Sequence, residues 1–163
     1  MSEVILFISG GAGVGKTTLL RSLAARIPHY IYQDLDELYL DEQGEACLDL
    51  SPASQAWLQG RVDAFVFSQD KPIVFAGVNF LQTNLRAQCS VVLNTSPWRV
   101  MMRLWRRAQD YGENRWWAWL GGVRAWQMKR CLVRQGFLSA DEHIIYDFLE
   151  GRRRDSRWRL LAH

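Results

Sequence analysis

A glycine-rich loop between an apolar run and a helix-forming segment constrains this chain more than any other feature of its sequence. Residues 10–17 read Gly-Gly-Ala-Gly-Val-Gly-Lys-Thr and directly follow the apolar residues 4–8. The pattern G-x-x-x-x-G-K-[ST] between a strand and a helix is typical of a phosphate-binding loop. Its glycines allow a tight turn whose N–H groups face phosphate oxygens, and the helix adds the positive end of its dipole. The sequence therefore predicts a nucleoside-triphosphate site.

Each part of this loop has an expected role. Lys16 places a positive charge at the outer phosphates, and the Thr17 hydroxyl is placed to hold a magnesium ion. Backbone amides of the loop and of the first helical turn supply further contacts. We therefore predict ATP and Mg²⁺ as ligands, with the nucleotide bound by Gly11, Ala12, Gly13, Val14, Gly15, Lys16, Thr17 and Thr18.

Length and composition favour one domain. A chain of 163 residues that is 48% hydrophobic can bury a substantial core, so residues 1–163 are predicted to form a single domain. The three cysteines lack disulfide or zinc spacing, as is typical of reduced thiols in the cytoplasm. Residues 4–8 are too few for a signal peptide or a membrane span. We expect a cytoplasmic protein with no membrane partner, whereas the sequence carries no marker of its oligomeric state.

Alternating strand and helix patterns predict an α/β fold. Apolar runs such as residues 72–78 are typical of parallel strands buried on both faces, and Ser-Pro pairs at 51–52 and 96–97 mark helix starts. We expect a three-layer P-loop NTPase fold with a five-stranded parallel sheet, a helical lid at about residues 97–135, and the site at the carboxyl ends of the strands. The expected elements are strands 3–9, 29–33, 72–78, 89–95 and 143–148, with helices 17–26, 52–69, 81–87, 97–111 and 115–135 and one at the carboxyl terminus.

A carboxylate follows the second predicted strand. Asp34 leaves that strand beside the phosphate loop, where it can orient a substrate hydroxyl, accept its proton and hold magnesium-bound water. Asp36 and Glu37 follow it, with an acidic helix start or solvated charges as the plainer interpretation. We predict a catalytic and metal-binding role for Asp34, with Asp36 as the weaker candidate.

These motifs resemble those of the nicotinamide riboside and uridine kinases. The resemblance rests on residues 8–19, on Ile27-Pro28 and on Tyr32-Gln33-Asp34, and the element order extends it over most of the chain. It implies a P-loop kinase in which Asp34 is the base or orienting carboxylate for the hydroxyl that receives the phosphoryl group. It also places Tyr39 near an aromatic residue that packs on the acceptor.

One position departs from that family. After the third strand the family has an acidic residue followed by glycine, whereas this chain has Ala76-Gly77. Magnesium binding then depends on Thr17, the phosphates, water and Asp34. Two readings remain open, a metal shell built differently or a protein without catalysis.

The segment after the fourth strand is both basic and aromatic. Residues 99–135 carry nine Lys and Arg against two Asp and Glu, a net charge of +7. Arg103, Arg106 and Arg107 share one helix face, as expected of lid arginines that close over a triphosphate, and we assign Arg103 and Arg107 to catalysis. A solvated basic helix is the alternative.

Six of the eight tryptophans lie between Trp98 and Trp126. Those in the second lid helix mostly trace one face with Leu120 and Val123, which favours core or lid packing. Trp116 or Trp117 could instead clamp a nucleobase-like ring. Aromatic residues interleaved with arginines also suit single-stranded nucleic acid.

Together these features predict an ATP-dependent kinase that phosphorylates a hydroxyl of a small, nucleoside-like acceptor. The adenine is expected between the lid and the segment after the fifth strand, near Gly151-Arg152. The alternatives are a polynucleotide 5′-hydroxyl or nucleoside monophosphate kinase, and a non-catalytic nucleotide-binding regulatory module.

Overall fold

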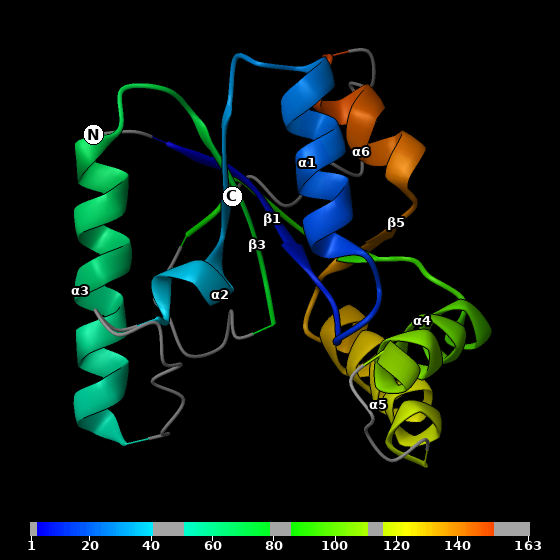
Figure 1. The fold of residues 1–163 in the computed structure, drawn as a ribbon. Helices are drawn as coiled ribbons and strands as arrows, with labels where there is room; N and C mark the ends of the chain where they lie inside the picture. Colours follow the sequence, from blue (N-terminus) through cyan, green and yellow to red (C-terminus); the bar gives the residue numbers. More distant parts are fainter. Residues whose placement is uncertain (1–2, 41–50, 79–85, 111–115, 152–163) are drawn as a thin grey trace.

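The computed structural model describes residues 3–40, 51–78, 86–110 and 116–151 (Figure 1). Strands and helices alternate along most of the chain. In chain order the elements are β1 (Val4–Ser9), α1 (Lys16–Arg26), β2 (Ile31–Asp34), α2 (Leu35–Leu38), α3 (Pro52–Ser68), β3 (Ile73–Gly77), β4 (Cys89–Leu93), α4 (Pro97–Asp110), α5 (Trp116–Arg134), β5 (Leu138–Ala140) and α6 (Glu142–Leu149).

The strands form one five-stranded sheet in the order β2-β3-β1-β4-β5, and every neighbouring pair is parallel. The central strand β1 ends at Ser9, which is in register with Gly77 of β3 and Val92 of β4. All carboxyl ends therefore lie at one edge of the sheet, and the chain turns from β1 into α1 there. The predicted five-stranded parallel sheet and α/β fold class are confirmed.

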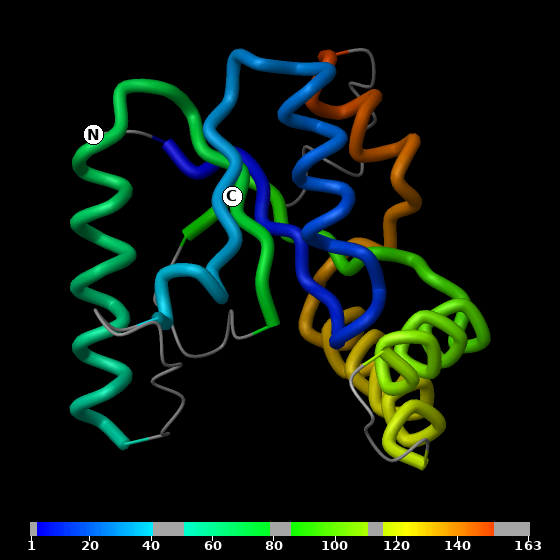
Figure 2. The backbone as a smooth tube through the Cα atoms, viewed as in Figure 1, coloured from blue at the N-terminus to red at the C-terminus, as the bar shows by residue number. Residues whose placement is uncertain are grey.

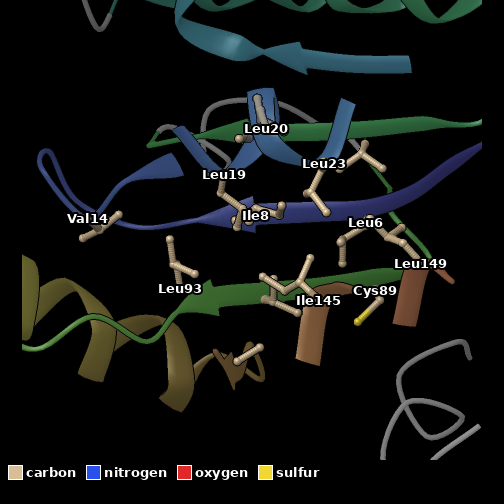
Figure 3. Packing of buried hydrophobic residues seen from close by; sticks show 14 of the residues in the cluster. Leu6, Ile8, Val14, Leu19, Leu20, Leu23, Cys89, Leu93, Ile145 and Leu149 are labelled. Carbon is tan, nitrogen blue, oxygen red and sulfur yellow. The ribbon is translucent and has the colours of Figure 1, made fainter. Parts of the chain in front are cut away.

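Two apolar clusters cover the two faces of the sheet. One joins β1 residues Leu6 and Ile8 to α1 and α6, where Leu23 and Ile145 are fully buried (Figure 3). The other joins Phe7 and Phe75 to α2, α3 and the end of α5. Helices thus lie on both sides of the sheet, with α1 and α6 opposite α3 (Figure 1). The alternation of side chains along β1 produces this arrangement, because successive residues point to opposite faces.

Both Ser-Pro pairs start helices as predicted. The Ser51 hydroxyl accepts a hydrogen bond from the Ser54 amide at 3.2 Å, and the Ser96 hydroxyl accepts one from the Arg99 amide at 3.3 Å. In each case proline is the first helical residue, where its missing N–H costs nothing.

The fifth strand was predicted at the wrong place. Residues 143–148 are not a strand but part of α6, and β5 lies earlier, at Leu138–Ala140. Asp141 precedes the helix, whose buried residues Ile145 and Leu149 are spaced by four. The β-branched Ile144 and Ile145 and the aromatic Tyr146 favoured a strand locally, yet packing of one helical face on the sheet outweighs that preference. The expected adenine position near Gly151 loses its basis, since the segment after β5 begins at Asp141.

Other predicted elements fall partly outside the described residues. The helix expected at 81–87 falls mostly on residues 79–85, and the helix expected at the carboxyl terminus falls on residues 152–163, both outside the described part. The tip between the two predicted lid helices, residues 111–115, is likewise outside the described part. Within the described part, α2 is a single-turn helix that the sequence patterns did not predict.

Helices α4 and α5 pack against each other beyond the carboxyl edge of the sheet, next to the loop between β1 and α1 (Figure 2). Their close approach depends on two glycines of α5. A Cβ atom on Gly121 would lie 2.2 Å from Cδ1 of Leu104, and one on Gly122 would lie 3.2 Å from the Pro97 carbonyl oxygen. These two helices occupy the predicted lid region, and their described bounds lie within one residue of the predicted helices 97–111 and 115–135.

None of the helices in the described residues is long and apolar enough to span a membrane.

Candidate functional site: the phosphate loop and its surroundings

The loop from Gly10 to Gly15 connects the end of β1 to the start of α1. Gly13 and Gly15 have φ angles of +79° and +103°, a left-handed backbone that residues with a Cβ rarely adopt. Gly15 is the N-terminal cap residue of α1, so the amides of the first helical turn open toward the loop. All predicted nucleotide-binding residues, 11–18, therefore lie in this loop or in the first turn of α1.

Lys16 is folded onto the loop that it serves. Its Nζ donates hydrogen bonds to the carbonyl oxygens of Gly10, at 2.8 Å, and Gly11, at 3.1 Å, and the residue is only 7% exposed. Burial lowers the pKa of Lys16, while the charges of Asp36 and Asp34 act in the opposite direction. A buried cation beside phosphate-binding amides is well suited to attract an anion, because few waters screen its charge.

Asp34 joins β2 to the loop. Its Oδ2 accepts a hydrogen bond from the Thr17 hydroxyl at 2.8 Å, and its Oδ1 accepts one from the Asp36 amide at 3.1 Å. The residue is the last of β2 and the N-terminal cap of α2, and it is 7% exposed. We expected Asp34 past the end of the strand and outside the core, but it is buried within the strand end. The proximity to Thr17 and the loop agrees with the prediction.

The β3 position where the resembling family has an acidic residue lies beside Asp34. Asp34 is in register with Ala76 on the adjacent strand, so its carboxylate lies one strand away from the position that Ala76 leaves without charge. Strand β3 ends one residue later at Gly77, where a Cβ atom would lie 2.8 Å from Cβ of Leu35. A larger side chain at Gly77 is therefore blocked by α2.

Asp36 is the second acidic residue at this site. Its side chain is exposed at its outer end, yet desolvation and the charge of Asp34 raise its pKa, and Lys16 partly opposes them. Asp36 therefore lies close enough to both Lys16 and Asp34 to interact with their charges. Glu37 accepts a hydrogen bond from the Gln33 amide group at 2.9 Å and has an ordinary surface position.

Arg103 of α4 reaches the loop from the opposite side. Its Nη1 donates hydrogen bonds to the carbonyl oxygens of Val14, at 2.7 Å, and Gly13, at 3.3 Å. A Cβ atom on Gly15 would lie 2.7 Å from that nitrogen, so only glycine leaves room for the guanidinium. Of the three predicted lid arginines, Arg103 makes these contacts with the loop. Arg107 lies one turn further along the same helix and is exposed.

Sequence reasoning missed two residues that also hold the loop. The Thr95 hydroxyl donates a hydrogen bond to the Val14 carbonyl at 3.0 Å. Ala125 of α5 contacts Gly11 so closely that a Cβ there would lie 3.2 Å from the Ala125 Cα. The position of Thr95 directly after β4 was a signal, because residues at the carboxyl ends of strands border the site. No local signal identified Ala125.

One cavity borders the loop, and a second borders the start of α1 and the end of β2. A cavity of about 30 Å³ lies on the side of β4 and α5, between Gly11, Thr95 and Trp126. A larger one, of about 120 Å³, lies on the side of β2 next to Asp34. Polar groups that can meet a ligand surround the larger cavity, which is lined by Thr17, Leu20, Arg21, Ala24, Tyr32, Asp34 and Glu37.

Two aromatic predictions were wrong. Tyr39 is 3% exposed and packs in the core beneath α3, so it offers no surface to an acceptor. The tryptophans of α5 do not form a buried face, because this helix buries small residues and Leu132 instead. The exposed large apolar residues of α5 are Trp116, Trp117, Trp119, Leu120, Val123, Trp126 and Val133.

The side chains at the loop suit magnesium, which needs few protein ligands, better than a metal ion that is held by protein side chains alone. Thr17 and Asp34 offer a hydroxyl and a carboxylate oxygen 2.8 Å apart, the hard oxygen donors that magnesium prefers. Within the described residues no group of three or more His, Cys, Asp or Glu side chains could form a complete metal cage. Magnesium in such sites keeps waters and binds phosphate oxygens, so one or two protein ligands suffice.

Comparisons with known proteins agree with the fold. No protein-family model matches this chain, and no curated protein matches it in sequence. Shikimate kinase from Bacteroides thetaiotaomicron has a similar structure, with a TM-score of 0.51 and 18% identity over 81% of this chain and 82% of that chain. The protein TT1252 from Thermus thermophilus gives 0.49 and 15%, over 82% and 86% of the two chains. A gluconokinase from Sinorhizobium meliloti 1021 gives 0.44 and 14%, over 65% and 66%. The chain thus shares its α/β fold with shikimate kinase.

Proposed function

We propose that this protein is an ATP-dependent kinase that transfers the γ-phosphoryl group to a hydroxyl of a small molecule. The observation that carries the proposal is the contact between Thr17 and Asp34, at 2.8 Å, beside the buried Lys16. It joins a phosphate-binding loop to a carboxylate at the carboxyl edge of the sheet. A nucleotide site alone does not require that carboxylate, whereas phosphoryl transfer does.

The nucleotide side of the site follows from the loop. Loop amides and the start of α1 would hold the phosphates, and Lys16 would leave the carbonyl oxygens of Gly10 and Gly11 for the outer phosphate oxygens. Arg103 already lies on the loop and would stabilise charge on the transferred group. Thr17 and Asp34 would hold magnesium, which supplies charge neutralisation at the phosphates when bound.

The two carboxylates suit different roles. Both oxygens of Asp34 are engaged, one by the Thr17 hydroxyl and one by the Asp36 amide, which suits a fixed ligand near the metal. Asp36 has a raised pKa and an exposed end, so it is better suited to receive a proton from an acceptor hydroxyl. Asp34 therefore takes the metal side, in place of a carboxylate at Ala76, and Asp36 joins it as the acceptor-side carboxylate.

The acceptor class is a small polyhydroxylated or nucleoside-like molecule. The cavity of about 120 Å³ beside Asp34 has a cationic and an acidic side chain, Arg21 and Glu37, on its wall. Such a polar surface suits hydroxyl groups more than an apolar ligand.

Transfer of γ-labelled phosphate from ATP to a panel of acceptors tests this function. The panel contains nucleosides, sugars, sugar acids, shikimate, nucleoside monophosphates and a 5′-hydroxyl oligonucleotide, and each is compared with a reaction lacking acceptor. Label transfer to one small acceptor, lost in Lys16→Ala, supports the proposal. Release of phosphate only, at a rate no acceptor changes, would show an ATPase.

A nucleotide-dependent regulatory module is the second candidate, because Ala76 stands where the resembling family has an acidic residue. Calorimetry separates the two. If the protein binds ATP in the presence of magnesium but neither transfers nor hydrolyses phosphate with any acceptor of the panel, the regulatory module is favoured and the kinase proposal is overturned.

A further inference from the structure

The outer surface of α5 is aromatic and basic at once. Trp117, Trp119 and Trp126 are 59%, 57% and 44% exposed, and two of these rings lie under arginines. Arg124 lies 5.8 Å above the ring centroid of Trp117, and Arg130 lies 4.7 Å above that of Trp126. At helical spacing Trp119, Trp126 and Arg130 share one face of α5, whereas Trp117 and Arg124 lie on the other side of the helix. We call Trp119, Trp126 and Arg130 the tryptophan–arginine surface.

This surface follows from how α5 packs. Its buried residues Ala118, Gly122 and Ala125 recur at helical spacing and face α4 and the phosphate loop. Small residues bring this part of the helix backbone close to its neighbours and leave the tryptophan side chains on the outside. Such a cluster of exposed rings is unusual on a monomer and indicates a binding surface.

The charge of α5 restricts what can bind there. Residues 116–134 carry four Lys and Arg and no Asp or Glu. A second copy docked through the same surface would bring like charges together, which is unfavourable. The partner must therefore be an anion that can also pack against aromatic rings.

Two kinds of anionic partner meet that condition, and the placement of the arginines distinguishes them. A membrane-bound helix keeps its rings on one face and its cations on the other. Here Arg130 lies over the ring of Trp126 itself, so inserting that ring into lipid would bury the guanidinium group. Stacked bases with a phosphate backbone instead match rings and a cation that lie in one row.

We propose that the tryptophan–arginine surface binds single-stranded nucleic acid. Bases stack on Trp119 and Trp126, which share a helix face and lie about 10 Å apart along the axis, given a rise of ~1.5 Å per residue. That span matches about three nucleotides at ~3.4 Å each. Arg130 lies in the same row and contacts phosphate. This binding is separate from the proposed phosphoryl transfer and does not rest on it.

Fluorescence anisotropy with a labelled single-stranded oligothymidylate of about 20 nucleotides tests the proposal, since single-strand sites of this kind span about 4–16 nucleotides. We expect Trp119→Ala and Trp126→Ala each to weaken binding roughly tenfold, as for loss of one base–aromatic stack. Arg130→Ala should weaken binding and flatten its salt dependence. A duplex of equal length should bind at least about tenfold more weakly, because its bases are not free to stack.

The chain offers matched controls. Trp57 on α3 is an exposed tryptophan with Arg61 at 4.9 Å from its ring centroid, and Lys71 is an exposed cation in the turn before β3. Trp57→Ala and Lys71→Ala should leave the affinity unchanged. Circular dichroism confirms that each variant is folded, and Lys16→Ala should still bind the strand.

Several results would overturn the proposal. These are no binding to the oligonucleotide, equal binding to the duplex, or an effect of Trp57→Ala as large as that of Trp126→Ala. Flotation with anionic phospholipid vesicles that depends on Trp119 and Trp126, without strand binding, would assign the surface to membranes. Sedimentation showing a dimer that dissociates in these two variants would assign it to self-association.

Discussion

Single residues at the phosphate loop form a coupled charge cluster. Burial lowers the pKa of Lys16 and the charges of Asp36 and Asp34 oppose it, while burial and Asp34 raise the pKa of Asp36 and Lys16 opposes them. The pKa of Lys16 and the pKa of Asp36 therefore each depend on the other group and on the charge of Asp34. A bound triphosphate would enter this cluster as a further set of negative charges.

Lys16→Ala should lower ATP affinity at least about tenfold and abolish phosphoryl transfer, because the charge aimed at the outer phosphates is lost. Isothermal calorimetry in magnesium measures the affinity. Lys71→Ala removes an equal charge from an exposed position and should change neither. Unaltered ATP affinity in Lys16→Ala would contradict the nucleotide site.

Asp34→Asn should reduce turnover by roughly 100-fold or more, since a positioned carboxylate is lost while the hydrogen bond to Thr17 can still form. ATP should still bind, and the magnesium concentration needed for half-maximal turnover should rise. Asp63→Asn on α3, whose carboxylate accepts a hydrogen bond from Gln59 in a surface position, is the control. Turnover within a few-fold of the wild type would remove Asp34 from the mechanism.

Asp36→Asn should lower turnover and raise stability at neutral pH. The raised pKa of Asp36 means that the folded state favours its protonated form, so its contribution to stability is present at low pH. That contribution is lost as the pH rises through the raised pKa, whereas asparagine stays neutral throughout. Thermal melts at several pH values should show that the melting temperature of the variant rises relative to that of the wild type as the pH increases.

The rate profile gives a second readout of the same residue. The acid limb of kcat/KM should lie above the ordinary pKa of an aspartate and should disappear in Asp36→Asn. If the limb persists in that variant, Asp36 does not receive the proton.

At the scale of elements, α4 and α5 contact the loop from one side, and β2 contacts the start of α1 from the other. Arg103 and Thr95 hold the Val14 carbonyl, and Ala125 packs against Gly11. A movement of either helix would therefore move the loop backbone directly. This mechanical connection is what a lid requires, because closure must change the contacts of the phosphates.

Arg103→Ala should lower turnover by more than it lowers nucleotide affinity, because a lid arginine acts mainly on charge that develops during transfer. We expect a smaller effect for Arg107→Ala and none for Arg106→Ala, an exposed arginine of the same helix. Steady-state kinetics and calorimetry on the three variants separate the two quantities. Equal losses of affinity and turnover in Arg103→Ala would indicate a binding residue only.

At the scale of the whole molecule, the proposed nucleotide site joins both halves of the sheet. The loop extends from the central strand β1, and it contacts β2 through Asp34 and the region after β4 through Thr95. A ligand that orders the loop should therefore stabilise the entire fold rather than one part of it.

Magnesium and a non-hydrolysable ATP analogue should raise the melting temperature. At about 100 times the dissociation constant, binding adds ~2.7 kcal/mol, or about 5–10 °C for a domain of this size. Removal of magnesium with a chelator should reduce the shift, and Lys16→Ala should lose most of it. A shift of equal size in Lys16→Ala would place the analogue elsewhere.

The sequence by itself determined the features that depend on short stretches of chain. The loop of residues 10–17, the apolar strands, the Ser-Pro helix starts and the emergence of Asp34 at the sheet edge all follow from local patterns. Backbone conformation, burial on both faces and proline geometry act within a few residues, so a single stretch suffices to read them.

Only the tertiary structure decided the rest. It turned residues 143–148 into a helix, exposed the tryptophans of α5, and brought Arg103 and Ala125 onto the loop. Each of these outcomes depends on which surfaces meet between elements distant in sequence. A tryptophan on a helix is apolar in any context, but whether it is buried depends on whether a neighbouring element covers it. In α5 mainly small residues face the neighbouring elements, so the tryptophans remain exposed.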